Sequence, residues 1–264
     1  MENSVRVVSI EDLERDRFLD FLCRDKVLHV FTIYDLTCMG EKCKVWAAFT
    51  NEHVCGYLFE FNQEIIRTHG TADSISRLLH LSDLREPTFI IEPHHKQVIT
   101  ESFEPVQPTD SSSKTKITTY YVMKSDVDSF KPSVNHHVKK LTTDDSTEVS
   151  DQLGKEWKAR IEKVLCEGGI AYGACHKGFL AALATVSEFV DEIALIRGVY
   201  TKPSLRNKGL ATSASSALVE ELIRLGKEPI LWVAKDNLPA RKVYKRIGFH
   251  RTEHELLGFK ARKI

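Results

Sequence analysis

Two kinds of hydrophobic periodicity alternate along the chain, one with period two and one with spacings of three and four. The first predicts half-buried strands, and the second predicts amphipathic helices. In the first half, the pattern predicts strands over 4–10, 44–49, 54–61, 65–69, 88–91 and 116–123, and helices over 11–30, 72–81 and 94–103.

The second half repeats this order of elements. Its pattern predicts strands over 137–141, 169–176, 178–188, 192–201, 229–234 and 253–260, and helices over 144–167, 208–225 and 239–247. The polar stretch 125–134, which contains a proline, separates the halves. The element order indicates a degenerate internal duplication, with a first domain at 1–130 and a second at 131–264, although little residue identity links the two.

The composition is that of an ordinary globular protein: 42% of the 264 residues are hydrophobic, 28% are charged, and the formal net charge is zero. The N-terminal residues Met1–Arg6 lack the apolar run of a signal peptide, and no stretch reaches about 18 consecutive apolar residues. None of the six cysteines forms a C-x-x-C pair. We therefore expect a soluble cytoplasmic protein with free thiols, no metal and no membrane partner.

Charge is distributed unevenly along the chain. The segment Thr201–Ile264 holds 14 Lys and Arg against 6 Asp and Glu. Such a segment suits an anionic ligand, but its charges are scattered and are not interleaved with aromatic residues as in a nucleic-acid platform. We expect no nucleic-acid partner.

The strongest candidate site is the stretch Gly198–Ala211, with the sequence GVYTKPSLRNKGLA. A strand pattern enters it at 193–196, and a helical pattern leaves it and stops at Gly226, a typical position after a helix end. Residues 206–211 therefore form a loop that opens a helix. The first backbone N–H groups of a helix lack internal partners and lie at the positive end of its dipole, so they suit a phosphate. An ordinary strand-to-helix turn also produces R-x-x-G-x-A, so this motif is weak by itself.

A second motif follows at 237–249, with the sequence NLPARKVYKRIGF. Asn237 suits a helix N-cap, Pro239 the first helical turn and Gly248 the helix end. The two motifs together, V-Y-T-x-P-x-x-R-x-x-G-x-A and N-x-x-A-x-x-x-Y-x-x-x-G-F, resemble the GNAT superfamily of N-acyltransferases, and most of all its glycine N-acyltransferase-like branch. The resemblance covers 135–264.

The first half shows only the element order of that fold. Its corresponding stretch, 68–73, lacks R-x-x-G-x-A and has Asp73 where a phosphate would lie. It resembles a GNAT-like domain that has lost CoA.

The resemblance implies a fold and a set of binding residues. The fold is α/β, with two GNAT-like domains in tandem, each a mixed and mostly antiparallel sheet flanked by helices. Acetyl-CoA is the implied co-substrate. Its pantetheine arm would pair with the backbone of Val199, Tyr200 and Thr201 and lie near Asn237. Its pyrophosphate would lie on Arg206, Asn207, Lys208, Gly209, Leu210 and Ala211.

Tyr244 is the tyrosine of the family motif, and in related enzymes that residue protonates the departing thiolate. Attack of an amine on a thioester produces an oxyanion, for which a backbone N–H near Val199 is a candidate donor, and then a thiolate that benefits from a proton. A phenol with a pKa of about 10 can supply this proton and regain it from solvent. The alternative is that Tyr244 only packs beneath the sheet.

The general base is harder to assign. Members of the family often use a glutamate on the central strand, but the residue four positions before Val199 is Leu195. Glu192, at the start of that strand, and Glu188, at the end of the preceding one, are the candidates, each reaching a water over the substrate. Both are equally typical of exposed strand-end carboxylates, and a chain of waters is a further alternative.

Two adjacent histidine pairs, His94-His95 and His136-His137, are weaker candidates. Neighbouring residues on a strand face opposite sides, so such a pair does not easily share one metal there. Trp157 lies where the substrate-facing helices of this fold are found, and it either lines the acceptor pocket or packs in the core.

We therefore expect an N-acyltransferase that moves an acetyl or short acyl group from acyl-CoA to a primary amine by direct attack in a ternary complex. The alternative is a non-catalytic CoA-binding or sensing module whose N-terminal domain binds protein. Release of free CoA on a panel of amines distinguishes the two. The sequence leaves open the acceptor, whether small molecule or protein, the acyl chain length and the oligomeric state.

Overall fold

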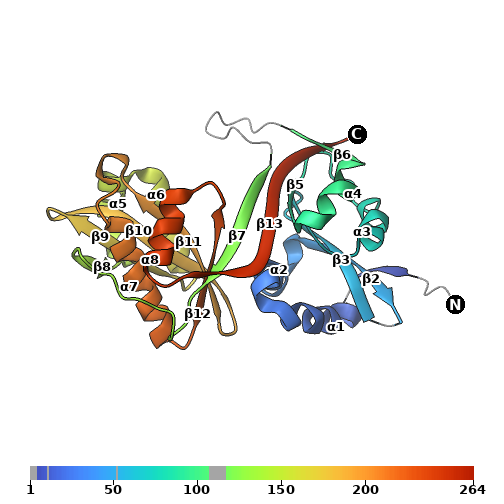
Figure 1. Ribbon diagram of the computed structural model, residues 1–264, viewed down its shortest axis with the longest axis horizontal. Helices are drawn as coiled ribbons and strands as arrows, with labels where there is room; N and C mark the ends of the chain where they lie inside the picture. Colours follow the sequence, from blue (N-terminus) through green and yellow to red (C-terminus); the bar gives the residue numbers. More distant parts are fainter. Residues whose placement is uncertain (1–4, 11, 52, 107–116) are drawn as a thin grey trace. The chain divides into compact units, whose positions relative to one another are not determined.

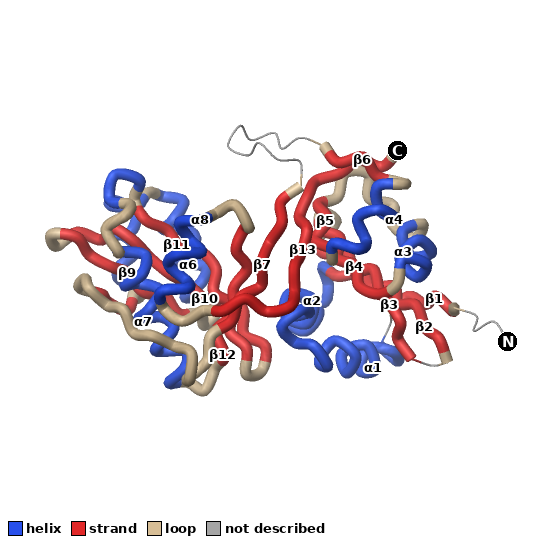
Figure 2. The backbone as a smooth tube through the Cα atoms, viewed as in Figure 1, coloured by secondary structure: helices blue, strands red, loops and turns tan. Residues whose placement is uncertain are grey.

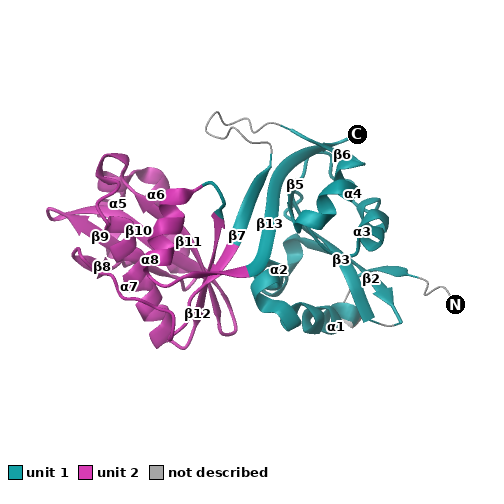
Figure 3. Ribbon diagram, in the orientation of Figure 1, with its two compact units in different colours: residues 1–121, 234–236, 253–264 teal, residues 122–233, 237–252 magenta. Residues whose placement is uncertain are grey.

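The computed structural model describes residues 5–10, 12–51, 53–106 and 117–264. The chain divides into two compact units (Figure 3). Unit 1 comprises 1–121, 234–236 and 253–264, and unit 2 comprises 122–233 and 237–252. The C-terminal residues 253–264 thus lie with the N-terminal segment, whereas the sequence-based division assigns them to the second domain. No helix among the described residues is both long and apolar enough to cross a membrane.

Unit 1 is built on a sheet in the order β1-β2-β3-β4-β5-β13, in which only β4 and β5 run parallel (Figure 1). The short strand β6 pairs with β13. The elements of this unit are β1 (Arg6–Ser9), α1 (Asp12–Leu22), η1 (Cys23–Asp25), α2 (Lys26–Cys38), η2 (Gly40–Lys42), β2 (Cys43–Thr50), β3 (His53–Phe61), β4 (Ile65–Gly70), α3 (Ala72–Leu79), β5 (Thr88–Ile91), η3 (Pro93–His95), α4 (Lys96–Thr100), β6 (Phe103–Pro105), the first part of β7 (Thr118–Lys124) and most of β13 (His250–Lys263).

Unit 2 is built on a sheet in the order β12-β11-β10-β9-β8, in which only β11 and β12 run parallel. Helices α5 and α6 pack against β10, and α7 packs against β9, β10 and β11 (Figure 2). The elements of this unit are β8 (Val138–Lys140), η4 (Thr143–Asp145), α5 (Ser146–Leu153), α6 (Lys155–Cys166), β9 (Ile170–His176), β10 (Phe179–Val190), β11 (Ile193–Thr201), η5 (Pro203–Leu205), α7 (Leu210–Arg224), β12 (Glu228–Ala234) and α8 (Leu238–Arg246).

The predicted fold class is confirmed, because each unit is a mixed and mostly antiparallel sheet flanked by helices. The element order predicted from the periodicity is also confirmed, except that it lacks the short strand β6. Two details were wrong. Helix α2 continues to Cys38, although its second half, 31–38, is rich in aromatic and β-branched residues that favour strands. The three-residue strand β6 is too short to show any period.

The core of unit 1 contains an ion pair between α2 and β4. The Nη1 atom of Arg67 lies 2.6 Å from Oδ2 of Asp35, and the two residues are only 9% and 4% exposed. The guanidinium of Arg67 also lies between 5.4 and 5.9 Å from the ring centroids of Phe31, Phe59 and Phe61. The carboxylate and the three aromatic rings together replace the hydration that the arginine loses on burial.

Breaking this pair should destabilise unit 1 strongly. In Asp35→Asn the guanidinium stays buried without its counter-charge, so we expect the free energy of unfolding to fall by about 3–5 kcal/mol. The matched control is Asp73→Asn, which breaks the exposed pair to Arg77 at 3.0 Å and should cost less than about 1 kcal/mol. Urea denaturation followed by circular dichroism measures both. Equal losses in the two variants would show that the buried pair contributes no more than a surface pair.

Candidate active site

Strands β11 and β12 pair over a short length and then separate. Their parallel ladder joins Ile193, Ala194 and Leu195 to 228–230, while the strands themselves continue to Thr201 and Ala234. Beyond Leu195, within the described part of the chain, the edge of β11 that faces β12 has no ladder partner there. An extended ligand can pair with such an edge in the manner of an added strand.

A β-bulge lies on β11 just where the two strands have separated. Leu183 is opposite Tyr200 and Thr185 is opposite Arg197, so β11 has one residue more than β10 between these pairs. The extra residue falls at Gly198, whose φ of 71° belongs to the left-handed region. The hydroxyl of Thr185 donates a hydrogen bond to the carbonyl of Arg197 and holds the bulge. A bulge leaves a backbone group unpaired and changes the direction in which it points.

Side chains from α6 cover the face of the sheet at this bulge. A Cβ atom added to Gly198 would lie 2.5 Å from Nε of Arg160, so the guanidinium packs directly on the glycine. The Arg160 guanidinium lies 5.6 Å from the Trp157 ring centroid, and the Trp157 ring lies 4.5 Å from the ring of Tyr200. No described residue forms an ion pair with Arg160, but the Glu188 carboxylate attracts it, while burial and the neighbouring Arg197 lower the pKa of Arg160.

Glu188 lies on the same face and is not the exposed strand-end carboxylate that the sequence suggested. Strand β10 continues to Val190, and Glu188 sits inside the ladder opposite Leu195 with only 7% exposure. Its Oε1 atom lies 2.6 Å from Nη1 of Arg197, and its Oε2 accepts a hydrogen bond from Ser187 at 2.8 Å.

Glu192, the other candidate base, lies elsewhere. It is exposed in the turn that precedes β11, at the opposite end of this strand from Val199. Seven residues of extended chain span roughly 23 Å at about 3.3 Å per residue. The structure therefore places Glu188 near the bulge and Glu192 away from it.

The loop between β11 and α7 has the geometry of an anion site. After η5, Asn207 and Gly209 both adopt positive φ, at 62° and 80°, and Gly209 is the N-cap of α7. No side chain caps this helix, so the first N–H groups of α7 are left without a side-chain partner. When left-handed residues such as Asn207 and Gly209 alternate with other conformations, successive backbone N–H groups point inward and form a concave anion-binding nest. A Cβ atom added to Gly209 would meet only Nε2 of His136, at 3.7 Å, so the approach to the loop is open.

Basic residues lie near the loop. Nε2 of His136 lies 2.6 Å from the carbonyl oxygen of Lys208. The pKa of His176 is lowered from its ordinary value by desolvation and by the nearby charges of Lys208, Lys177 and His136. The four residues therefore lie close enough to act on one another electrostatically, and the charges of Lys177 and Lys208 favour an anion.

Helix α8 carries the predicted acid. Its N-cap is Asn237, as predicted from the sequence, and the Asn237 side chain accepts a hydrogen bond from the N–H of Ala240 at 3.2 Å. Tyr244 is 8% exposed and packs against Phe249 with 5.8 Å between ring centroids. Burial raises the pKa of Tyr244 to about 12, so the phenol stays protonated throughout the neutral range.

Two buried polar atoms near the bulge have no hydrogen-bond partner among the described residues. They are Oγ1 of Thr201, at the end of β11, and Nε1 of Trp157, on α6. Buried polar groups are normally paired, so these two mark places where a ligand or water can complete the hydrogen bonding.

Comparison with known proteins gives one matching sequence family and a set of structures with the same fold. A profile of the family described as FR47-like protein matches residues 171–257. This segment contains both the bulge at Gly198 and the loop 206–211. No curated protein sequence matches the chain significantly.

Solved structures of GNAT proteins share the fold. A tandem GNAT protein from the clavulanic acid biosynthesis pathway superposes with a TM-score of 0.60 at 16% identity and covers 98% of each chain. A GNAT-family acetyltransferase from Colwellia psychrerythraea gives a TM-score of 0.58 at 14% identity, covering 97% of this chain and 99% of that one. A GCN5-related N-acetyltransferase from Sphaerobacter thermophilus gives 0.61 at 11% identity, covering 98% and 95%. The fold is therefore the GNAT acetyltransferase fold.

Sequence reasoning missed three residues at this site. Arg160 and Arg197 resemble ordinary surface arginines in the sequence, and Thr185 resembles any strand threonine. Only the pairing of β10 with β11 and the packing of α6 bring the three together. In the sequence, only Gly198, directly before Val199-Tyr200-Thr201, could have indicated the bulge.

Replacing Gly198 should destabilise the fold by more than the backbone strain of a positive φ angle alone. Gly198→Ala adds a Cβ atom 2.5 Å from Nε of Arg160 and 2.7 Å from Oγ1 of Thr185. The control is Gly178→Ala, because Gly178 has a similar φ of 84° and no neighbour within 4 Å of the added atom. Both variants pay a strain of about 1–2 kcal/mol, and we expect Gly198→Ala to lose roughly 1–3 kcal/mol more. Thermal unfolding measures the difference. Equal melting temperatures would show that the Arg160 and Thr185 side chains move to accommodate the added Cβ atom at no cost in stability.

Proposed function

We propose that unit 2 is an N-acyltransferase that moves an acetyl or short acyl group from acyl-CoA to a primary amine. The observation that carries this proposal is the bulge at Gly198 beside the separated strands β11 and β12, followed directly by an uncapped helix at Gly209. This arrangement offers a backbone edge for the pantetheine and a nest for the pyrophosphate. The GNAT fold of the chain supports it.

Each part of acyl-CoA has a proposed partner. The pantetheine pairs with the backbone of Val199, Tyr200 and Thr201 and passes near Asn237, and the unpartnered hydroxyl of Thr201 is available to it. The pyrophosphate takes the inward N–H groups at the start of α7. The residues proposed to hold it are Arg206, Asn207, Lys208, Gly209, Leu210 and Ala211.

The reaction is proposed to be a direct attack in a ternary complex. The amine nitrogen bonds to the thioester carbon, and the negative charge on the carbonyl oxygen is stabilised by a backbone N–H at the bulge near Val199. The carbon–sulfur bond then breaks, and Tyr244 gives its proton to the thiolate and regains one from solvent. A buried site disfavours a free thiolate, so a nearby phenol that remains neutral is a suitable donor.

Glu188 is the proposed acceptor of the amine proton, through a water. It is preferred to Glu192 because it lies near the bulge and its ion pair with Arg197 connects it to β11. This role is tested by measuring the turnover of Glu188→Gln at limiting amine and neutral pH. If this turnover equals that of the wild type, water alone accepts the amine proton.

Unit 1 is proposed to lack a CoA site. Its helix α3 is capped by Thr71, which accepts a hydrogen bond from the N–H of Ser74 at 3.2 Å, whereas α7 has no side-chain cap. Just past the ladder between β4 and β5, the side chains of His69 and Glu92 join at 2.6 Å. Side chains thus occupy the positions that a pantetheine and a phosphate would need.

The phosphate loop is tested by Gly209→Glu. This variant places a side chain and a negative charge at the start of α7, and we expect the affinity for CoA to fall at least about tenfold, roughly 1.4 kcal/mol. The matched control is Gly226→Glu, which lies beyond the other end of α7 with a similar φ of 70° and open surroundings. Calorimetry with CoA measures both. Unchanged affinity in a folded Gly209→Glu variant would place the pyrophosphate elsewhere.

The acid is tested by Tyr244→Phe, which keeps the ring and its packing. Turnover should fall about 10²-fold, the usual scale for general acid catalysis, while the affinity for CoA should change little. The control is Tyr172→Phe, on β9. Because burial raises the pKa of Tyr244 to about 12, its deprotonation should not reduce the wild-type rate until the pH approaches that value. Wild-type turnover in Tyr244→Phe, at a pH where chemistry limits the rate, would show that Tyr244 only packs.

The overall proposal is tested by release of free CoA from acetyl-CoA across a panel of amines. Tight binding of CoA with no release for any amine class would overturn the transferase assignment.

A further inference from the structure

The end of β5 in unit 1 carries a cluster of potential metal ligands that the acyl-transfer site does not use. It consists of Glu92, His94 and His95, within the sequence Glu-Pro-His-His. The argument against a metal shared by His94 and His95 applies only to a strand, on which neighbouring side chains face opposite sides, whereas the hydrophobic pattern predicts a helix over 94–103. The structure places them in the helical turn η3, and their ring centroids are only 4.1 Å apart.

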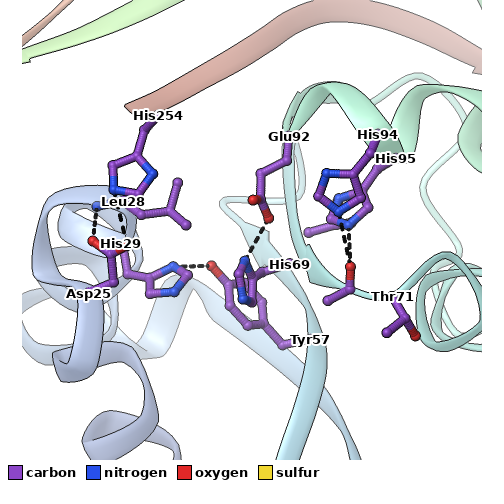
Figure 4. A network of polar contacts seen from close by, with 12 residues as sticks. Asp25, Leu28, His29, Tyr57, His69, Thr71, Glu92, His94, His95 and His254 are labelled. Atoms are coloured by element: carbon purple, nitrogen blue, oxygen red, sulfur yellow. Dashed lines mark hydrogen bonds and ion pairs between the residues drawn. The ribbon is translucent and has the colours of Figure 1, made fainter. Parts of the chain in front are cut away.

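The two histidine rings converge on one backbone oxygen (Figure 4). Nε2 of His95 lies 2.7 Å and Nε2 of His94 lies 3.2 Å from the carbonyl oxygen of Gly70, at the end of β4. One ligand atom from each of Glu92, His94 and His95 lies within 4.8 Å of the others. Glu92 precedes the three-residue turn that ends at His95, and residues three apart in a 3₁₀ turn lie above one another.

Two further residues orient these ligands. Oε2 of Glu92 lies 2.6 Å from Nδ1 of His69, and Nδ1 of His95 lies 2.9 Å from the hydroxyl of Thr68. A hydroxyl can donate or accept, so Thr68 satisfies Nδ1 of His95 in either tautomer. Nε2 of His95 can therefore carry a proton toward Gly70 or offer its lone pair to a metal. Outer partners of this kind are typical of histidine and carboxylate ligands in metal sites.

We propose that Glu92, His94 and His95 bind a divalent first-row transition metal, for which Zn²⁺ is the probe. Two imidazoles and a carboxylate are ligands that such ions prefer, and the carbonyl of Gly70 is positioned to be a fourth. The proposal concerns unit 1 alone and does not depend on the proposed acyl transfer.

The site must rearrange to take the ion: the side-chain ligand atoms, within 4.8 Å of one another, must approach, while Nε2 of His95 must move away from the Gly70 oxygen, which lies 2.7 Å from it. Metal–ligand distances of about 2.0–2.2 Å in a tetrahedron require ligand atoms about 3.4 Å apart. His95 is fully buried and held by Thr68, whereas His94 is exposed and can turn about its side-chain bonds. The approach falls mainly on His94, whereas His95 and the Gly70 carbonyl must separate by roughly 0.7 Å. The metal would then link the end of β5 to the end of β4.

The test is calorimetric titration of the full chain with zinc chloride after treatment with a chelator and its removal. We expect one saturable site per chain. His94→Ala should weaken binding at least about tenfold, and this exposed position should tolerate the change. His53→Ala removes another exposed histidine of unit 1 and should leave the affinity unchanged.

Two measurements prevent a folding defect from being mistaken for a lost ligand. Far-ultraviolet circular dichroism should be the same for both variants and the wild type. Cobalt(II) should give the visible absorption of a tetrahedral nitrogen- and oxygen-ligated ion in the wild type and in His53→Ala, but not in His94→Ala. The proposal is overturned if no stoichiometric site saturates, or if His94→Ala binds zinc and cobalt as the wild type does.

Discussion

The early end of the ladder between β11 and β12 is the constraint on which the candidate site depends. Parallel strands in one sheet would normally keep pairing, and here pairing stops after Leu195 and Ile230 although both strands continue. The bulge at Gly198 lies immediately beyond this point. The extra residue on β11 bends this strand and changes its direction. An unpaired strand edge and a redirected backbone group follow from the same local event.

The face of the bulge covered by α6 determines what kind of group can approach. Arg160 packs on Gly198 without an ion pair among the described residues, while Arg197 pairs with the buried Glu188, whose carboxylate also attracts Arg160. Trp157 and Tyr200 supply an aromatic surface beside them. Two guanidinium groups therefore share one carboxylate beside an apolar surface, and such surroundings strengthen electrostatic interactions with whatever binds there.

Unit 1 has the same order of strands around its parallel pair as unit 2, but the side chains at this place form different contacts. Where β4 and β5 end, His69 and Glu92 join, and Tyr57 lies 3.0 Å from Nδ1 of the buried His29. Burial, together with the neighbouring His69, lowers the pKa of His29 to about 3, so it stays neutral in the folded chain. The same backbone arrangement thus leaves an open edge in one unit and holds a closed polar network in the other.

The sequence by itself determined the fold class, most of the element order and the loop at 206–211 that opens helix α7. These depend on local properties: hydrophobic period, the glycine at a helix start, and the Asn237 cap three residues before Ala240. The tertiary structure alone decided that Glu188 is buried while Glu192 is remote, that Arg160 packs on Gly198, and that the rings of His94 and His95 meet at the carbonyl of Gly70. Each of these facts depends on strand register or on packing between elements distant in the chain, and a one-dimensional pattern contains neither.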